Sequence, residues 1–136
     1  MSYIFDTNVV SETRKRRASP SMLAFLRSIR DEPTYISVLT LGELRRGVVG
    51  KQAANPEMAD VFMQWLLDIE RDYANTTCEI TAAIAYRWGE ITVGRTRPAI
   101  DSLIAATALV NNFTVVTRNE RDYRDFGLRV INPWTA

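Results

Sequence analysis

Short apolar runs alternate with longer segments of helical spacing along the whole chain. Strands are predicted at residues 2–6, 34–37, 76–80 and 113–117 and in "LRVINPW". Helices are predicted at residues 8–13, in "LTLGELRRGVVG", "TAAIAYRWGEITVG" and "AIDSLIAATALVNN", and after the caps Ser19 and Asn55. Strands that alternate with helices form parallel sheets covered on both faces. We therefore expect a single three-layer α/β/α domain over residues 1–136, with four or five parallel strands.

Composition is that of an ordinary globular protein, with 46% hydrophobic and 24% charged residues. No apolar run approaches the roughly 20 residues that a membrane span needs. The first residues lack the basic-then-apolar order of a signal peptide, because Asp6 interrupts them. These features predict a cytoplasmic protein that does not enter a membrane. The one cysteine, Cys78, cannot form an internal disulfide and is interpreted as a packing residue.

Histidine is absent from the chain. This excludes Ser-His-Asp and Cys-His catalysis, ribonuclease chemistry based on paired histidines, and nearly every kind of zinc site. Only Lys15 and Lys51 are lysines among the 17 cationic residues, so arginine dominates. Because the guanidinium fork suits phosphate and carboxylate oxygens, this bias favours nucleic acid or an acidic protein as a partner.

Four acidic residues occupy positions that ordinary surface acids do not. Asp6 ends the first predicted strand, and Asp122 comes five residues after the strand at 113–117. Glu43 lies on a helix face that it shares with Gly47, away from the apolar stripe, and Asp101 interrupts a very apolar helix. In open parallel sheets, ligands bind beyond the carboxyl ends of the strands. We expect the four side chains to meet at this edge.

Each acid also has a simpler explanation when it is taken alone. Asp6 can cap the following helix, Asp101 can complement a helix dipole, and Glu43 can pair with Arg46. Asp122 can lie in a solvated loop among arginines. Together, however, carboxylates about 4 Å apart repel by roughly 4 kcal/mol at an effective dielectric near 20, so a cluster needs a cation or raised pKa values. Oxygen ligands alone favour Mg²⁺ or Mn²⁺, which activate water for phosphodiester hydrolysis.

Sequence blocks around these acids resemble a known family. "FDTNVVSE", "LGELRRG", "IDSLIAATAL" and "VVTRNERDY" followed by "INPW" are similar to the blocks of PIN-domain ribonucleases. More narrowly, they resemble VapC-type toxins of toxin–antitoxin pairs, in the FitB-like branch. The blocks occur in the family order and span nearly all of the chain. The resemblance implies a PIN-like fold and an endoribonuclease that depends on Mg²⁺ or Mn²⁺.

The resemblance also assigns roles to residues. It matches Asp6, Glu43, Asp101 and Asp122 to the acidic quartet that holds the metal, with Asp6 and Asp101 as the firmest ligands. Supporting polar roles fall on Asn8, Thr117 and Asn119. Some relatives carry the fourth acid at the position of Asn119, so either that position or Asp122 is the fourth ligand site.

Partners follow from the same resemblance. It implies an RNA substrate, a VapB-like antitoxin whose tail covers the active site, operator DNA bound only through that antitoxin, and a homodimer. Cationic candidates for RNA contact are Arg14, Arg17, Arg45, Arg46, Arg95 and Arg97. The apolar residues of "VFMQWLLDI" and "IAYRWGEI" belong either to the core or to the dimer interface.

Other functions are compatible with the sequence. The chain could be a PIN nuclease of RNA processing without an antitoxin, or a binding module whose acidic site is degenerate. A phosphotransferase of the haloacid dehalogenase type is disfavoured, because Asn8 stands where its second aspartate is required. Which RNA would be cleaved does not follow from the sequence.

Overall fold

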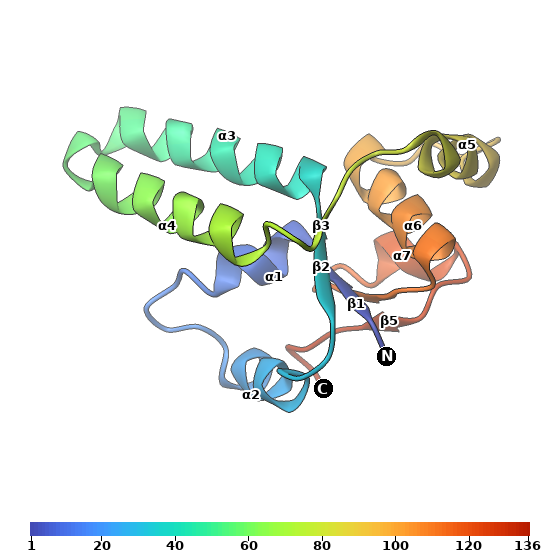
Figure 1. The fold of residues 1–136 in the computed structure, drawn as a ribbon, viewed down its shortest axis with the longest axis horizontal. Coiled ribbons are helices and arrows are strands. Elements are labelled where there is room, and N and C mark those ends of the chain that lie inside the picture. The colour runs from blue at the N-terminus through green and yellow to red at the C-terminus, as the bar shows by residue number, and fades with distance from the viewer.

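Five short parallel strands form one sheet in a computed structural model that describes residues 1–136 (Figure 1). They are β1 (Tyr3–Phe5), β2 (Thr34–Ser37), β3 (Thr77–Cys78), β4 (Thr114–Val116) and β5 (Val130–Ile131). Their spatial order is β3-β2-β1-β4-β5, and every neighbouring pair is parallel. This confirms the predicted fold class with five strands, although most strands are shorter than the apolar runs that predicted them.

Helices cover both faces of the sheet. They are α1 (Thr7–Glu12), α2 (Pro20–Ser28), α3 (Val38–Ala54), α4 (Ala59–Asp72), α5 (Ala82–Ile91), α6 (Ala99–Asn111) and α7 (Arg121–Arg124), with a 3₁₀ turn at Pro56–Met58. Figure 1 shows α3 and α4 as one long pair on one side of the sheet and α5 and α6 as a second pair on the other. None of these helices combines the length and apolar character that a membrane crossing requires.

The alternating directions of the side chains along β1, the central strand, explain why the protein has two hydrophobic cores. Tyr3 and Phe5 point to the face that α1, α2, α3 and α4 cover, whereas Ile4 points to the face that α6 and α7 cover. Successive side chains of a strand point to opposite faces, so a strand that is covered on both sides is apolar throughout. All three residues of β1 are buried, which the run "YIF" predicted.

Helix starts were predicted with mixed success. The Ser19 hydroxyl accepts the backbone N–H of Met22 at 3.3 Å, and Pro20 is the first residue of α2, as predicted. The prediction that Asn55 caps a long helix was wrong. Its side chain makes no capping hydrogen bond, and a 3₁₀ turn separates it from α4, which begins at Ala59. The four-residue helix α7 was not predicted, because so short a helix leaves no periodic pattern.

Packing along α4 differs from the predicted stripe at one position. Phe62, Trp65, Leu66 and Ile69 pack into the larger core as expected. Val61 is 57% exposed and lies outside that stripe. One helix of 14 residues can present only part of its circumference to the sheet, and Val61 falls beyond that part.

Sheet topology sets the place of the functional site. The chain leaves β1 toward β2 on one side, and β4 later pairs with the other side of β1. This reversal of strand order opens a crevice beyond the carboxyl ends of the two central strands. The backbone N–H of Asp6 donates to the carbonyl of Val116 at 3.0 Å, so the residues that follow both strands start from the same edge.

Adjacent leucines on α4 provide a test of this packing. Leu66 is fully buried, whereas Leu67 is 47% exposed. We expect Leu66→Ala to lower the free energy of unfolding by about 2–5 kcal/mol, because it leaves a cavity in the core. Leu67→Ala should cost less than about 1 kcal/mol. Urea denaturation monitored by circular dichroism would measure both, and equal losses would contradict the described orientation of α4.

Candidate functional site

Asp6 is the most constrained acid of the site. The residue is 96% buried, and it follows β1 while capping α1 by accepting the backbone N–H of Thr7 at 2.8 Å. Its second oxygen accepts the Thr117 hydroxyl at 2.8 Å and the Asn8 side-chain amide at 3.3 Å. The capping role and the site role therefore coexist, because the two carboxylate oxygens serve different donors.

Two predicted supporting residues tie the loops around Asp6 together. The Asn8 amide donates to the Thr117 hydroxyl oxygen at 3.4 Å, and its carbonyl oxygen accepts the backbone N–H of Arg118 at 3.2 Å. Asn119, the third predicted supporting residue, contributes its backbone N–H to Thr117 at 3.0 Å, while its side chain is exposed. The start of α1 and the residues after β4 are thus joined side by side.

Glu43 on α3 is held by α1. The Thr7 hydroxyl donates to Oε1 of Glu43 at 2.5 Å and also contacts the hydroxyl of Thr40 at 3.2 Å. No ion pair joins Glu43 to Arg46, which was the alternative explanation for this acid. Thr7 therefore links Glu43 to the same short segment that carries Asp6.

Asp101 shows that the four acids converge. It lies in the first turn of α6 and is half-buried. Burial, together with the negative charges of Asp6, Asp122 and Glu43, raises its pKa to about 7. Asp122 lies in the first turn of α7 and is partly buried, so it does not belong to an open loop. The sheet edge brings together all four acids that the sequence singled out, each from a different element.

Tyr123 is a residue of the site that the sequence did not reveal. Its hydroxyl is fully buried and completes no hydrogen bond, although it lies close enough to Asp6 to lower the pKa of that carboxyl. Burial, followed by the charges of Asp6 and Asp101, raises the pKa of Tyr123 far above its usual value. The hydroxyl stays protonated and is a donor without a partner. Nothing in "RNERDY" distinguishes this tyrosine from a core residue.

Burial also governs the charge of Asp6. It raises the pKa of Asp6, while the hydrogen bonds from Thr117 and Thr7 oppose the rise and the charge of Glu43 adds to it. The net direction is upward. Asp6 and Asp101 thus both carry a charge that their surroundings disfavour until a cation or a proton neutralises it.

The chemistry of this donor set fits a hard divalent cation. All the possible ligand atoms are carboxylate oxygens, and the charges of the other three acids act on Asp101. No three of these acidic side chains are yet placed to hold one ion together. Binding of one ion by three of them would therefore require their side chains to move.

Around the acids, the predicted cationic residues differ in their surroundings. Arg97 and Arg95 both pair with Asp125, and Arg95 also donates to its backbone carbonyl at 3.0 Å. Arg14 lies over aromatic rings of α4. The remaining predicted arginines are exposed and form no ion pair: Arg17, Arg45 and Arg46.

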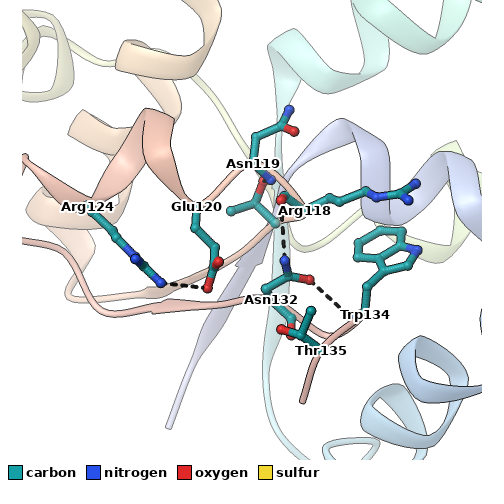
Figure 2. Close-up of polar contacts among 8 residues, drawn as sticks. Arg118, Asn119, Glu120, Arg124, Asn132, Trp134 and Thr135 are labelled. Carbon is teal, nitrogen blue, oxygen red and sulfur yellow. Dashed lines mark hydrogen bonds and ion pairs between the residues drawn. The ribbon is translucent and has the colours of Figure 1, made fainter.

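The loop after β4 is pinned by the end of the chain. Figure 2 shows the Asn132 side chain between Arg118 and Trp134, donating to the Arg118 carbonyl at 3.4 Å and accepting the Trp134 N–H at 2.9 Å. The Arg118 guanidinium lies 5.2 Å from the centre of the Trp134 ring. A cleft of about 300 Å³ follows this loop, lined by residues 118–122. The sequence block "INPW" therefore positions the loop that leads to Asp122.

Known proteins resemble this chain along most of its length. The VapC ribonuclease Y4jK of Sinorhizobium fredii is 30% identical over 96% of each chain. Toxin FitB of Neisseria gonorrhoeae is 29% identical over 96% of this chain and 97% of its own. Among solved structures, the crystal structure of FitAcB from Neisseria gonorrhoeae matches with a TM-score of 0.86 and 30% identity, covering 98% of this chain and 99% of that one.

A family profile agrees with these similarities. The profile described as "PIN domain" matches residues 3–127, which include every strand except β5 and all four acids. The strand order, the acidic cluster at the carboxyl ends of the central strands and the matched sequence blocks therefore lead to one conclusion. The chain belongs to the PIN-domain family.

Proposed function

We propose that this single-domain protein is a metal-dependent endoribonuclease that acts as the toxin of a toxin–antitoxin pair. The observation that carries the proposal is the convergence of Asp6, Glu43, Asp101 and Asp122 in a chain without histidine. Such a site can bind a divalent cation but cannot supply imidazole acid–base chemistry. The names of the ribonuclease and the toxin among its relatives support the same activity.

Each acid would have a distinct task. Asp6 and Asp101 would hold the cation, Mg²⁺ or Mn²⁺, and Glu43 and Asp122 would complete the shell directly or through water. When bound, such a cation lowers the pKa of water and offsets the negative charge that develops on a phosphodiester. Thr117 and Asn8 orient Asp6, and Thr7 orients Glu43, so the ligands are partly prearranged.

RNA would reach this acidic edge across cationic groups. Arg17, Arg45 and Arg46 are exposed and free to contact phosphates, which supply affinity without a sequence code. Asp125 already offsets the charge of Arg95 and Arg97, so these two are the weaker candidates. The partly buried Asp122 is a better fourth ligand than the exposed amide of Asn119.

Partners and location complete the proposal. The resemblance to VapC-type toxins supports a VapB-like antitoxin that covers the site, with operator DNA bound only through it, in the cytoplasm. A homodimer would use apolar residues that the fold leaves open, of which Tyr86 is 74% exposed and Val61 57% exposed. An operon that encodes a small DNA-binding protein beside this gene would separate the toxin from a processing nuclease.

Asp6→Asn and Asp101→Asn should each lower RNA cleavage by at least about 100-fold, since even outer-shell changes around a metal cost about 10–100-fold. Cleavage of total RNA by purified protein with Mg²⁺, and with EDTA in its place, measures this. Asp31→Asn, an exposed acid outside the site, is the control and should retain full activity. Full cleavage by either site variant, or by the wild type in EDTA, would exclude the proposal.

The pH dependence of stability should show that the acids lie close together. The folded-state pKa of Asp101, about 7, exceeds its usual 3.8, so the folded protein prefers the protonated form. The resulting stabilisation is complete below pH 4 and is lost as the pH rises through 7. At pH 8 without divalent cations, Asp101→Asn should therefore be more stable than wild type by about 1 kcal/mol, or about 3 °C in Tm, allowing for its partial exposure.

Thermal denaturation between pH 4 and pH 8 checks this difference. Adding Mn²⁺ at pH 8 should raise the Tm of the wild type, because a cation offsets the same repulsion. The variant should respond much less. A pH profile shared by both proteins would mean that Asp101 does not face the other three acids.

Tyr123→Phe separates orientation of the metal ligands from folding. Removing a buried hydroxyl without a partner should leave the free energy of unfolding unchanged or slightly higher. Affinity for Mn²⁺, measured by calorimetry, should fall about tenfold if this hydroxyl positions Asp6. Tyr86→Phe, at an exposed tyrosine, should change neither quantity. Unaltered Mn²⁺ affinity would reduce Tyr123 to a packing residue.

A further inference from the structure

A cavity next to Glu43 has features of an anion-binding site. It lies where α1, α3 and α4 meet and has a volume of about 80 Å³. Figure 1 shows α1 beneath the α3–α4 pair. The polar residues that line the cavity, together with a glycine and an indole, are Ser11, Arg14, Glu43, Gly47, Lys51 and Trp65.

The two cations in this cavity are held without an ion-pair partner. Arg14 lies over Phe62 and Trp65, 5.9 and 5.7 Å from the ring centres, and Lys51 lies 5.6 Å from the centre of Phe62. Neither forms an ion pair. Aromatic faces hold a cation in place while leaving its charge available. Arg95 and Arg97, in contrast, share the carboxylate of Asp125.

The cavity lies next to the acidic site. Glu43 is part of the cavity wall, and its carboxylate accepts the Thr7 hydroxyl beside Asp6. An anion held by Arg14 and Lys51 would therefore lie on the α3 side of the acids. RNA that presents one phosphate to the acidic cluster brings further phosphates to its flanks.

We propose that this cavity binds a backbone phosphate of the RNA next to the phosphodiester that is cleaved, with Arg14 and Lys51 as its cationic ligands and Ser11 as a hydroxyl ligand. This assignment rests on the proposed ribonuclease function and adds a subsite to it. Two cations without an ion-pair partner, one of them an arginine, suit a phosphate group. Stacking of a base on Phe62 or Trp65 is disfavoured, because cations already lie over these rings.

Gly47 offers a way to close the cavity without changing charge. A Cβ at this position would meet nothing within 4 Å, and the backbone has ordinary helical angles. A leucine there would project into the cavity while favouring the helix, since glycine is about 1 kcal/mol worse than alanine inside a helix. Gly50, in the same helix and equally open, does not line the cavity and is the matched control.

Binding of a fluorescent oligouridylate to Asp101→Asn protein, with Mg²⁺ and at several salt concentrations, tests the subsite without cleavage. Adding Arg14→Gln and Lys51→Gln together should weaken binding about tenfold. It should also reduce the slope of log affinity against log salt by about 0.7, the value for one phosphate of a single strand. Gly47→Leu should weaken binding to a similar extent. Arg30→Gln, at an exposed arginine outside the cavity, and Gly50→Leu should change neither the affinity nor the slope.

Cleavage assays in otherwise wild-type protein distinguish this subsite from the ribonuclease function itself. Arg14→Gln and Gly47→Leu should raise KM about tenfold and leave kcat within about twofold. Active wild type with cavity variants that behave like their controls would overturn the subsite and leave the ribonuclease standing. Inactive wild type would instead reject the proposed function.

Weaker binding of an oligo-aspartate peptide, with RNA binding unchanged, would assign the cavity to a protein partner and also overturn the proposal. Thermal denaturation would exclude variants that fail to fold.

Discussion

A carboxylate buried at the end of the central strand is the constraint on which the rest of this structure depends. Burying a charged group is costly unless it is hydrogen-bonded, and Asp6 receives donors from Thr7, Asn8 and Thr117. These donors come from both sides of the crevice between β1 and β4. Holding Asp6 in place therefore also joins the start of α1 to the loop after β4, which is the loop that leads to Asp122.

This arrangement places the acids close enough to repel one another, and the packing of the helices that carry them holds them there. Glu43, Asp101 and Asp122 come from three helices that pack on different parts of the sheet. None of these helices can retreat without exposing apolar surface, so the acids stay near one another even when their charges oppose it. An arrangement that is unfavourable without a cation provides selectivity for a state in which a cation is present.

The helix α3 combines two kinds of electrostatic surface. Glu43, Gly47 and Lys51 follow one another at successive turns on the side that faces α1 and α4. Residues four apart lie on the same face of a helix. At one end of this face, Glu43 belongs to the acidic cluster. At the other end, Lys51 lines the cavity, for which Gly47 leaves room because it has no side chain. A polymer with closely spaced negative charges can contact both, provided that a cation mediates the acidic end.

Much of this was determined by the sequence alone, because burial on both faces makes a strand apolar and because polar residues after such strands must lie at one edge of a parallel sheet. That reasoning identified the strands, the layer architecture and the two acids that follow strands, Asp6 and Asp122, whereas Glu43 and Asp101 were singled out by their unusual positions on helices. Side-chain surroundings were decided only by the tertiary structure. The exposure of Val61, the pairing of Arg97 with Asp125 and the buried hydroxyl of Tyr123 all depend on elements far apart in the chain meeting in space. A local pattern carries the period of a helix or strand, but not the identity of the groups that pack against it.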